Sequence, residues 1–256
     1  MATSEVRPSA LSPSPARLRL QEFFFPFMAL LIIAAVFLGF ARTFFLAPLY
    51  HFHLPNLLVA IHGIVFASWI ALFAIQASLV AIGRTALHRK LGLLGAVLVG
   101  LVFVMAYAVM LEGVHRDFTI PGQTQTTPSD RAQILALDVV GINTSFAMFF
   151  AGLLLRRSPE FHKRLMLFGT IGMTGPAIAR WPFAFIANHP PLVGIVMQLL
   201  GILVLVFDLL TTRRVHRATW LGVATLFLVP AIAIPMSAAP FWLNFLASLK
   251  QYLSRF

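Results

Sequence analysis

The sequence predicts an all-α integral membrane protein, and its composition and apolar periodicity carry that prediction. Of the 256 residues, 59% are hydrophobic and 11% are charged, whereas about 25% of the residues in a soluble domain are charged. The mean hydropathy is +0.89. A soluble globule of this size could not bury so much apolar surface. The chain has no cysteine, which excludes disulfide scaffolds and thiolate metal sites.

Seven apolar runs predict seven transmembrane helices, because a helix needs about 20 apolar residues to cross a bilayer. The first run is too long for the apolar region of a signal peptide, so we interpret it as a retained span. Before the fourth run, Thr127, Pro128 and Asp130 supply an N-cap, a first-turn proline and a first-turn acid. The predicted spans are residues 23–46, 57–82, 91–111, 132–155, 165–187, 192–210 and 220–237.

The two ends of the chain differ from this pattern. Residues 1–20 are rich in Ser, Pro and Arg and predict a flexible cytoplasmic tail before the transmembrane domain at 21–239. Residues 240–256 predict an amphipathic helix that lies in the outer membrane interface, the alternative being a frayed tail. Its polar stripe consists of Asn244, Ser248, Gln251 and Arg255.

The basic residues predict the orientation. The net charge of +11 could indicate nucleic-acid binding, but in an apolar chain Lys and Arg usually mark the cytoplasmic loops. We therefore expect a cytoplasmic N-terminus and an external C-terminus, which agrees with an odd number of spans, and no nucleic-acid partner. The predicted cytoplasmic set is Arg7, Arg17, Arg19, Arg84, Arg89, Lys90, Arg156, Arg157, Lys163, Arg164, Arg213, Arg214 and Arg217.

An internal repeat is the next hypothesis. A histidine followed by basic residues opens the third, fifth and seventh spans, at His88, His162 and His216. The even-numbered spans each carry one strongly polar residue about six positions from their outer end, namely His62, Asp138 and Gln198. This pattern predicts a threefold repeat of helical hairpins after a lone first helix. The alternative is that basic turns with a histidine recur through composition.

Ionisable residues within the spans mark a candidate site, because they are costly in the membrane. Arg42, His62, Asp138 and Arg180 are predicted at outer-leaflet depth. Either Asp138 pairs with Arg180 or Arg42, or the group lines an outward-facing pocket for an anionic ligand or a lipid headgroup. The predicted pocket also includes Gln198 and two residues that share a helix face with His62, namely Trp69 and Gln76. The alternative for this face is packing against neighbouring helices.

A proline is expected to bend the fifth span close to this group. Pro176 follows Gly169, Gly172 and Gly175, and it leaves the Gly172 carbonyl without its helical partner. The predicted kink lies one turn before Arg180.

Histidines raise a second possibility, a redox cofactor. No predicted span contains two histidines a membrane thickness apart, which disfavours two-haem cytochromes. A single haem or copper site remains open at the outer histidines, which are His51, His53, His62 and His189. The inner histidines, together with their basic neighbours, are expected to contact lipid headgroups.

Two stretches carry a resemblance. Residues 62–95, HGIVFASWIALFAIQASLVAIGRTALHRKLGLLG, and residues 162–182, HKRLMLFGTIGMTGPAIARWP, are similar to a group of bacterial polytopic membrane proteins of unknown function. The resemblance implies a multi-pass protein of the bacterial inner membrane and transfers no catalytic residue.

The function expected from these features is non-enzymatic. The sequence lacks a phosphate-binding glycine loop, an HExxH motif and a GxSxG motif. We expect an accessory or assembly subunit, or a module that binds a small ligand, with membrane lipids and other membrane-protein subunits as partners. The alternative is a membrane redox protein that binds haem or copper.

Overall fold

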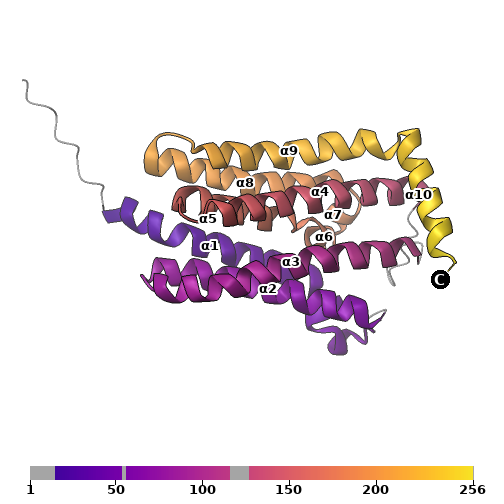
Figure 1. Ribbon diagram of the computed structural model, residues 1–256, viewed down its shortest axis with the longest axis horizontal. Helices are drawn as coiled ribbons and strands as arrows, with labels where there is room; N and C mark the ends of the chain where they lie inside the picture. The colour runs from indigo at the N-terminus through magenta and orange to yellow at the C-terminus, as the bar shows by residue number, and fades with distance from the viewer. Residues whose placement is uncertain (1–14, 54–55, 116–126, 256) are drawn as a thin grey trace, which may run out of the picture.

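The computed structural model describes residues 15–53, 56–115 and 127–255, which form helices joined by short turns (Figure 1). These residues contain no β-strand, so the all-α prediction is confirmed for the described part of the chain. The α-helices are α1 (Pro15–Phe40), α2 (Leu57–Ala81), α3 (Thr85–His115), α4 (Pro128–Leu154), α5 (Pro159–Gly172), α6 (Gly175–Ile178), α7 (Ala184–Ala187), α8 (Pro191–Thr212), α9 (Arg217–Ser237) and α10 (Pro240–Leu253).

Six helices of the described chain are long and apolar enough to cross a membrane. They are α1 with the π-helical turn Ala41–Phe45 that follows it, α2, α3, α4, α8 and α9. The outside of the bundle is as apolar as its interior. On α1, for example, Phe23 and Phe27 are exposed, whereas Met28 and Ile32 are fully buried. Such a surface is typical of helices surrounded by hydrocarbon.

The fifth predicted span is not a continuous helix, so the prediction of one helix over 165–187 is wrong. The structure instead has α5, which ends at Gly172, and two single turns, α6 and α7. Pro176 has no N–H to donate to the Gly172 carbonyl. Trp181 precedes Pro182, a position at which the helical conformation is disfavoured. Two prolines six residues apart therefore convert the expected kink into a break.

The N-terminal prediction also needs correction. The helix α1 begins at Pro15, so residues 15–20 are helical and not part of a tail, while residues 1–14 lie outside the described chain. Proline is favoured in the first helical turn, where no N–H partner is needed. The following residues, up to Leu20, are mostly good helix formers.

The predicted N-cap of the fourth span is confirmed. The Thr127 hydroxyl accepts a hydrogen bond from the Asp130 backbone N–H at 3.2 Å, and the Asp130 carboxylate accepts one from the Thr127 N–H at 3.0 Å. This reciprocal capping box satisfies two donors. It begins α4 at Pro128, four residues earlier than predicted.

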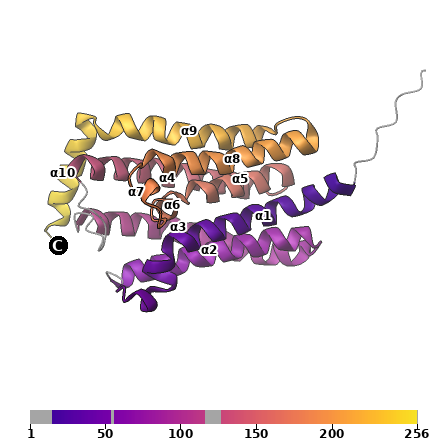
Figure 2. The same cartoon turned by 180° about the vertical axis from the view of Figure 1, so that it is seen from behind.

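Three tight helical hairpins organise the bundle. The pairs α2–α3, α4–α5 and α8–α9 pack along each other. Their turns lie at the same end of the bundle as the start of α1, at the left of Figure 1 and at the right of the reverse view in Figure 2. These turns contain Arg84, Arg157 and Arg214. The predicted basic residues of these three turns therefore lie at one end of the bundle, which we call the basic end, whereas Arg7 lies outside the described residues.

The last helix, α10, crosses the opposite end of the bundle (Figure 1). The Trp242 indole N–H donates to the Ala132 carbonyl of α4 at 3.0 Å, and the partly buried Leu246 and Leu249 pack against the same cluster. The predicted polar stripe is exposed from Asn244 to Arg255. The helix is therefore ordered against the bundle and is amphipathic as predicted.

Candidate functional site

The break after α5 determines where Arg180 lies. On α1, Gly39 packs so closely against α6 that an added Cβ would come within 2.0 Å of the Ala177 carbonyl oxygen. The Trp181 indole N–H donates to the Ala35 carbonyl of α1 at 2.9 Å. These two contacts hold the segment on either side of Arg180 against α1. Without the break, a continuous helix would carry Arg180 along a different face.

Arg180 lies among three other elements of the bundle. Its guanidinium stands over the Phe40 ring of α1, 5.3 Å from the ring centroid, and its Nη1 donates to the Pro176 carbonyl at 2.7 Å. The same guanidinium interacts electrostatically with Asp138 of α4 and with His62 of α2. The Arg180 guanidinium is therefore within electrostatic range of one carboxyl group and one imidazole, and we call these three residues the charged cluster.

The charged cluster does not contain the direct ion pair that the sequence suggested. Among the described residues, no ion pair within 4.0 Å joins Asp138 to Arg180 or Arg42, so the attraction acts over a longer distance. Nδ1 of His62 is buried and has no hydrogen-bond partner. The charged cluster thus has a donor-rich guanidinium and a buried imidazole nitrogen with hydrogen-bonding capacity left over. Such an arrangement can bind a small polar ligand.

The other predicted pocket residues lie elsewhere. Arg42 is exposed in the π-helical turn, where its guanidinium stands 5.4 Å from the Tyr50 ring centroid. Trp69 is buried in the core and packs edge-on against Phe149 at 4.9 Å. Gln198 is partly buried on α8. Of the predicted set, the described structure shows an electrostatic interaction of Arg180 with His62 and with Asp138.

Gln76 joins two helices at the basic end of the bundle. Its Nε2 donates to the His88 carbonyl at 3.1 Å, and its own carbonyl lies 3.3 Å from Nδ1 of His88. The predicted stripe on α2 thus runs from the charged cluster at His62, through the core at Trp69, to an interhelical link at Gln76. This outcome favours the packing alternative for Trp69 and Gln76.

The outer histidines do not form a common ligand set in the described chain. His51, His53 and His189 are exposed, and Nδ1 of His189 contacts the Phe185 carbonyl at 3.0 Å. Within residues 15–53, 56–115 and 127–255, no group of three His, Cys, Asp or Glu side chains is placed to hold a metal ion. The described residues therefore do not provide a copper site with three such ligands.

The inner histidines link the helices of their hairpins. Nδ1 of His162 lies 2.8 Å from the Gly152 carbonyl, as Nδ1 of His88 lies against that of Gln76. His216 instead caps α9, because its Nδ1 accepts from the Ala218 N–H at 3.1 Å. These contacts give all three histidines a role within the fold in addition to the headgroup contact that we expected.

A buried ionic network at the basic end was missed by the sequence prediction. Arg164 of α5 is 2% exposed, and its guanidinium pairs with Asp208 of α8 and with Glu160. Thr219 of α9 accepts from Nε of Arg164 at 3.1 Å and donates to the Asp208 carboxylate at 2.6 Å. The His216 backbone N–H donates to the same carboxylate at 2.9 Å. We call these five residues the Arg164 network.

The Arg164 network corrects the expected headgroup contact of Arg164, and it shows that Asp208 was a sequence signal for a buried ion pair. Arg164 does not reach toward headgroups as expected, because Asp208 neutralises it inside the bundle. Asp208 is an acid within a predicted apolar span, the same criterion that singled out Asp138. Since all of its groups are paired, the Arg164 network is structural, whereas the charged cluster is not satisfied in this way.

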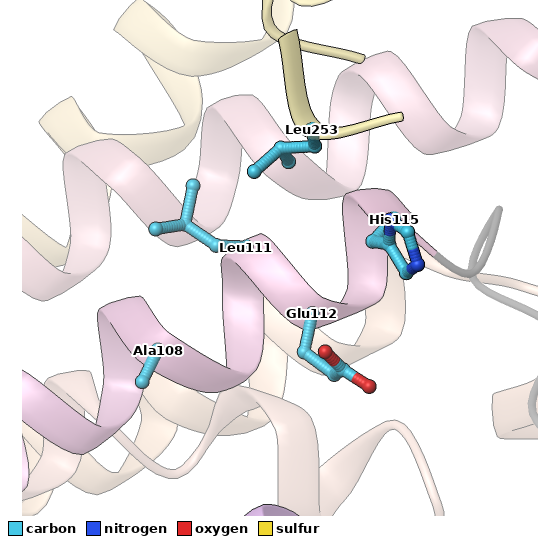
Figure 3. Close-up of a pocket in the computed structure, with 5 residues that line it drawn as sticks. All are labelled: Ala108, Leu111, Glu112, His115 and Leu253. Carbon is cyan, nitrogen blue, oxygen red and sulfur yellow. The ribbon is translucent and has the colours of Figure 1, made fainter. Parts of the chain in front are cut away.

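A shallow pocket of about 270 Å³ opens near the C-terminal end of α3 (Figure 3). It is lined by Ala108, Leu111, Glu112, His115 and Leu253. The Glu112 carboxylate accepts a hydrogen bond from the Asn56 amide at 2.8 Å, and Asn56 in turn caps α2. We therefore assign Glu112 to the start of α2 and keep the charged cluster as the candidate site.

Comparison of the chain with protein-family models, with curated proteins and with solved structures finds no match.

Proposed function

We propose that the chain crosses the membrane seven times and that the fifth crossing is the interrupted segment α5–α6–α7. This proposal is supported by the position of the helix ends, because α5 starts at the basic end and α8 starts toward the opposite end (Figure 1). The positive-inside rule then puts the N-terminus in the cytoplasm and α10 in the outer interface. The resemblance of residues 62–95 and 162–182 supports the bacterial inner membrane as the location.

The threefold hairpin repeat belongs to the same proposal. Four positions after the repeated histidines lie Gly92 of α3 and Met166 of α5. Each faces a residue of the first helix of its own hairpin, and the two pairs differ in which helix carries the larger side chain. A Cβ at Gly92 would lie 3.9 Å from Nε2 of Gln76, and a Cβ at Gly152 would lie 3.0 Å from Sδ of Met166. One hairpin thus places the large side chain on its first helix and the other on its second. What the two hairpins share is the histidine contact, because Nδ1 of His88 lies against the Gln76 carbonyl and Nδ1 of His162 against the Gly152 carbonyl. This shared contact supports a common hairpin design for α2–α3 and α4–α5.

The function that the geometry supports best is the non-enzymatic binding of a small ligand that carries an acidic group. The observation that carries this proposal is that Arg180, which interacts electrostatically with both His62 and Asp138, forms no direct ion pair with Asp138 in the described chain. Ionisable residues inside a membrane protein usually serve a ligand or an ion. Interrupted helices are also where membrane proteins place polar ligands, because the free backbone groups there can be satisfied by a ligand.

The test is ligand-induced stabilisation of the full-length protein in lipid nanodiscs. Acetate and inorganic phosphate serve as probes, and the midpoint of thermal unfolding is measured as each is added. A probe at 100 times its Kd should stabilise the protein by about 2.7 kcal/mol. Arg180→Gln should abolish this shift. Arg42→Gln is the matched control, because Arg42 is an exposed arginine away from the charged cluster, and it should leave the shift unchanged.

Two results would reject the proposal. If neither probe moves the unfolding midpoint of the wild-type protein, or if Arg42→Gln removes the shift as fully as Arg180→Gln, the charged cluster is not the binding site. An absorption spectrum of the purified protein addresses the alternative function. A Soret band that disappears in His62→Gln would assign the protein to the haem-binding class instead.

A further inference from the structure

The seam between α3 and α4 presents a polar pair to the outside of the bundle. Asn143 is exposed and lies close to the middle of α4. Its side-chain amide donates to the Tyr107 hydroxyl of α3. Next to this pair, Phe103 of α3 packs against Phe146 of α4, with ring centroids 4.2 Å apart. An exposed amide at this depth would meet hydrocarbon, where unsatisfied polar groups are costly.

In this pair, one hydrogen-bond acceptor of Asn143 and the hydroxyl donor of Tyr107 remain without a partner in the described chain. Nδ2 of Asn143 donates to the Tyr107 hydroxyl and also to the Val139 carbonyl at 2.7 Å. Because a carbonyl oxygen only accepts, the atom that contacts it must be the amide nitrogen, and both of its hydrogens are used. In the described chain, Oδ1 of Asn143 then has no donor and the Tyr107 O–H has no acceptor. The two unsatisfied groups are chemically complementary to each other.

The same surface contains an open position for a close helix approach. Gly100, Val104 and Tyr107 lie at i, i+4 and i+7 and therefore share one face of α3. Val104 is exposed, and a Cβ added at Gly100 would meet nothing within 4 Å. Small residues at membrane helix surfaces allow the backbones of two helices to approach closely.

From these observations we propose that the α3–α4 seam is the interface between two copies of this chain. A two-fold axis at the seam lets the Tyr107 O–H of one copy donate to Oδ1 of Asn143 in the other, and the same bond recurs by symmetry. A second copy satisfies both leftover groups at once, and Gly100 provides the room for it. This argument uses none of the residues of the charged cluster, so it stands or falls independently of the ligand proposal.

Förster resonance energy transfer in liposomes measures the association of the full-length chain. Since the chain has no cysteine, Arg157→Cys in the exposed α4–α5 turn gives a single labelling site at the basic end. We expect energy transfer that falls as lipid is added in excess, as it does for a reversible dimer. Tyr107→Phe removes the O–H alone and should weaken dimerisation about tenfold, because two membrane hydrogen bonds are lost.

Two matched glycine variants distinguish a loss of dimerisation at the interface from a general loss of stability. Gly100→Leu should abolish energy transfer by filling the interface. Gly194→Leu on α8 should leave it intact, although a Cβ at Gly194 also meets nothing within 4 Å. Both variants should unfold like the parent protein. A chain that is monomeric at every lipid dilution overturns the proposal, as does a dimer insensitive to both Tyr107→Phe and Gly100→Leu. The proposal is also overturned if the chain stays monomeric and the α3–α4 seam binds a different membrane protein.

Discussion

The Arg164 guanidinium of α5 and the Asp208 carboxylate of α8 form an ion pair that solvent does not reach, although 44 residues separate them in the sequence. This pair holds the basic end of the interrupted segment against α8 and α9. Arg180 lies between α6 and α7 of the same segment and lacks such a direct pair within the described chain. The ion pair of Arg164 thus holds the start of the segment in place, whereas Arg180 has no carboxylate of the described residues in direct contact.

Loss of the buried carboxylate should destabilise the protein strongly. Asp208→Asn preserves the side-chain size but leaves the Arg164 charge buried without its main counter-ion, and we expect a loss of about 3–5 kcal/mol. The free energy of unfolding is measured by denaturant titration in detergent. Glu160→Gln is the control, because its carboxylate is 55% exposed and should cost about 1 kcal/mol or less. Equal costs for the two variants would contradict the role given to Asp208.

A methyl group at Gly39 should disturb the break. Gly39→Ala places a Cβ 2.0 Å from the Ala177 carbonyl oxygen, so α1 and α6 must move apart. We expect a loss of about 1–3 kcal/mol in the free energy of unfolding. Gly100→Ala is the control, since that site is open and alanine is the better helix former. A Gly39→Ala protein as stable as the control would show that α1 and α6 do not pack as described.

Replacement of Trp242 should release α10 without unfolding the bundle. Trp242→Phe keeps the ring but removes the N–H that donates to Ala132, which costs about 1 kcal/mol. Hydrogen–deuterium exchange should increase in α10 and stay unchanged in α4. Trp220→Phe changes an exposed indole and should alter neither helix. Unchanged exchange in α10 would mean that its attachment does not depend on this hydrogen bond.

The stability of the basic end should fall as the pH is lowered. Burial, with the nearby Arg164 charge, holds the pKa of His216 below its ordinary value. The unfolded chain therefore takes up this proton first, so the stabilisation is complete above the ordinary histidine pKa and is lost as the pH falls below it.

The matching variant is His216→Asn, because asparagine caps a helix well but does not titrate. The free energy of unfolding is compared at about pH 7.5 and about pH 5.5, a range in which histidines titrate. The wild-type protein should lose more stability over this range than His216→Asn. Identical losses would assign the pH dependence to other groups.

Particular residues show how far sequence reasoning reached. The apolar runs predicted six of the long helices, and the Thr127 capping box predicted the start of α4, because both signals are local. Pro176 predicted a kink, but the second proline, Pro182, was not weighed, and the two together produce a break. The sequence also selected Arg42, His62, Asp138 and Arg180 as a group, since ionisable residues in apolar runs stand out, but the structure places Arg42 in the exposed π-helical turn. It attributed Arg164 to headgroup contact and overlooked Asp208.

The sequence by itself determined the helical class, the position of the long apolar helices and the gathering of basic residues in alternate turns. These features follow from hydropathy and from local capping, which depend on neighbouring residues. Only the tertiary structure decided which charges meet. Arg164 and Asp208 pair, and Arg180 does not pair directly with Asp138, because distances across the bundle depend on how α1 packs against the interrupted segment. That packing rests on the close contact between Gly39 and Ala177, which no local pattern encodes.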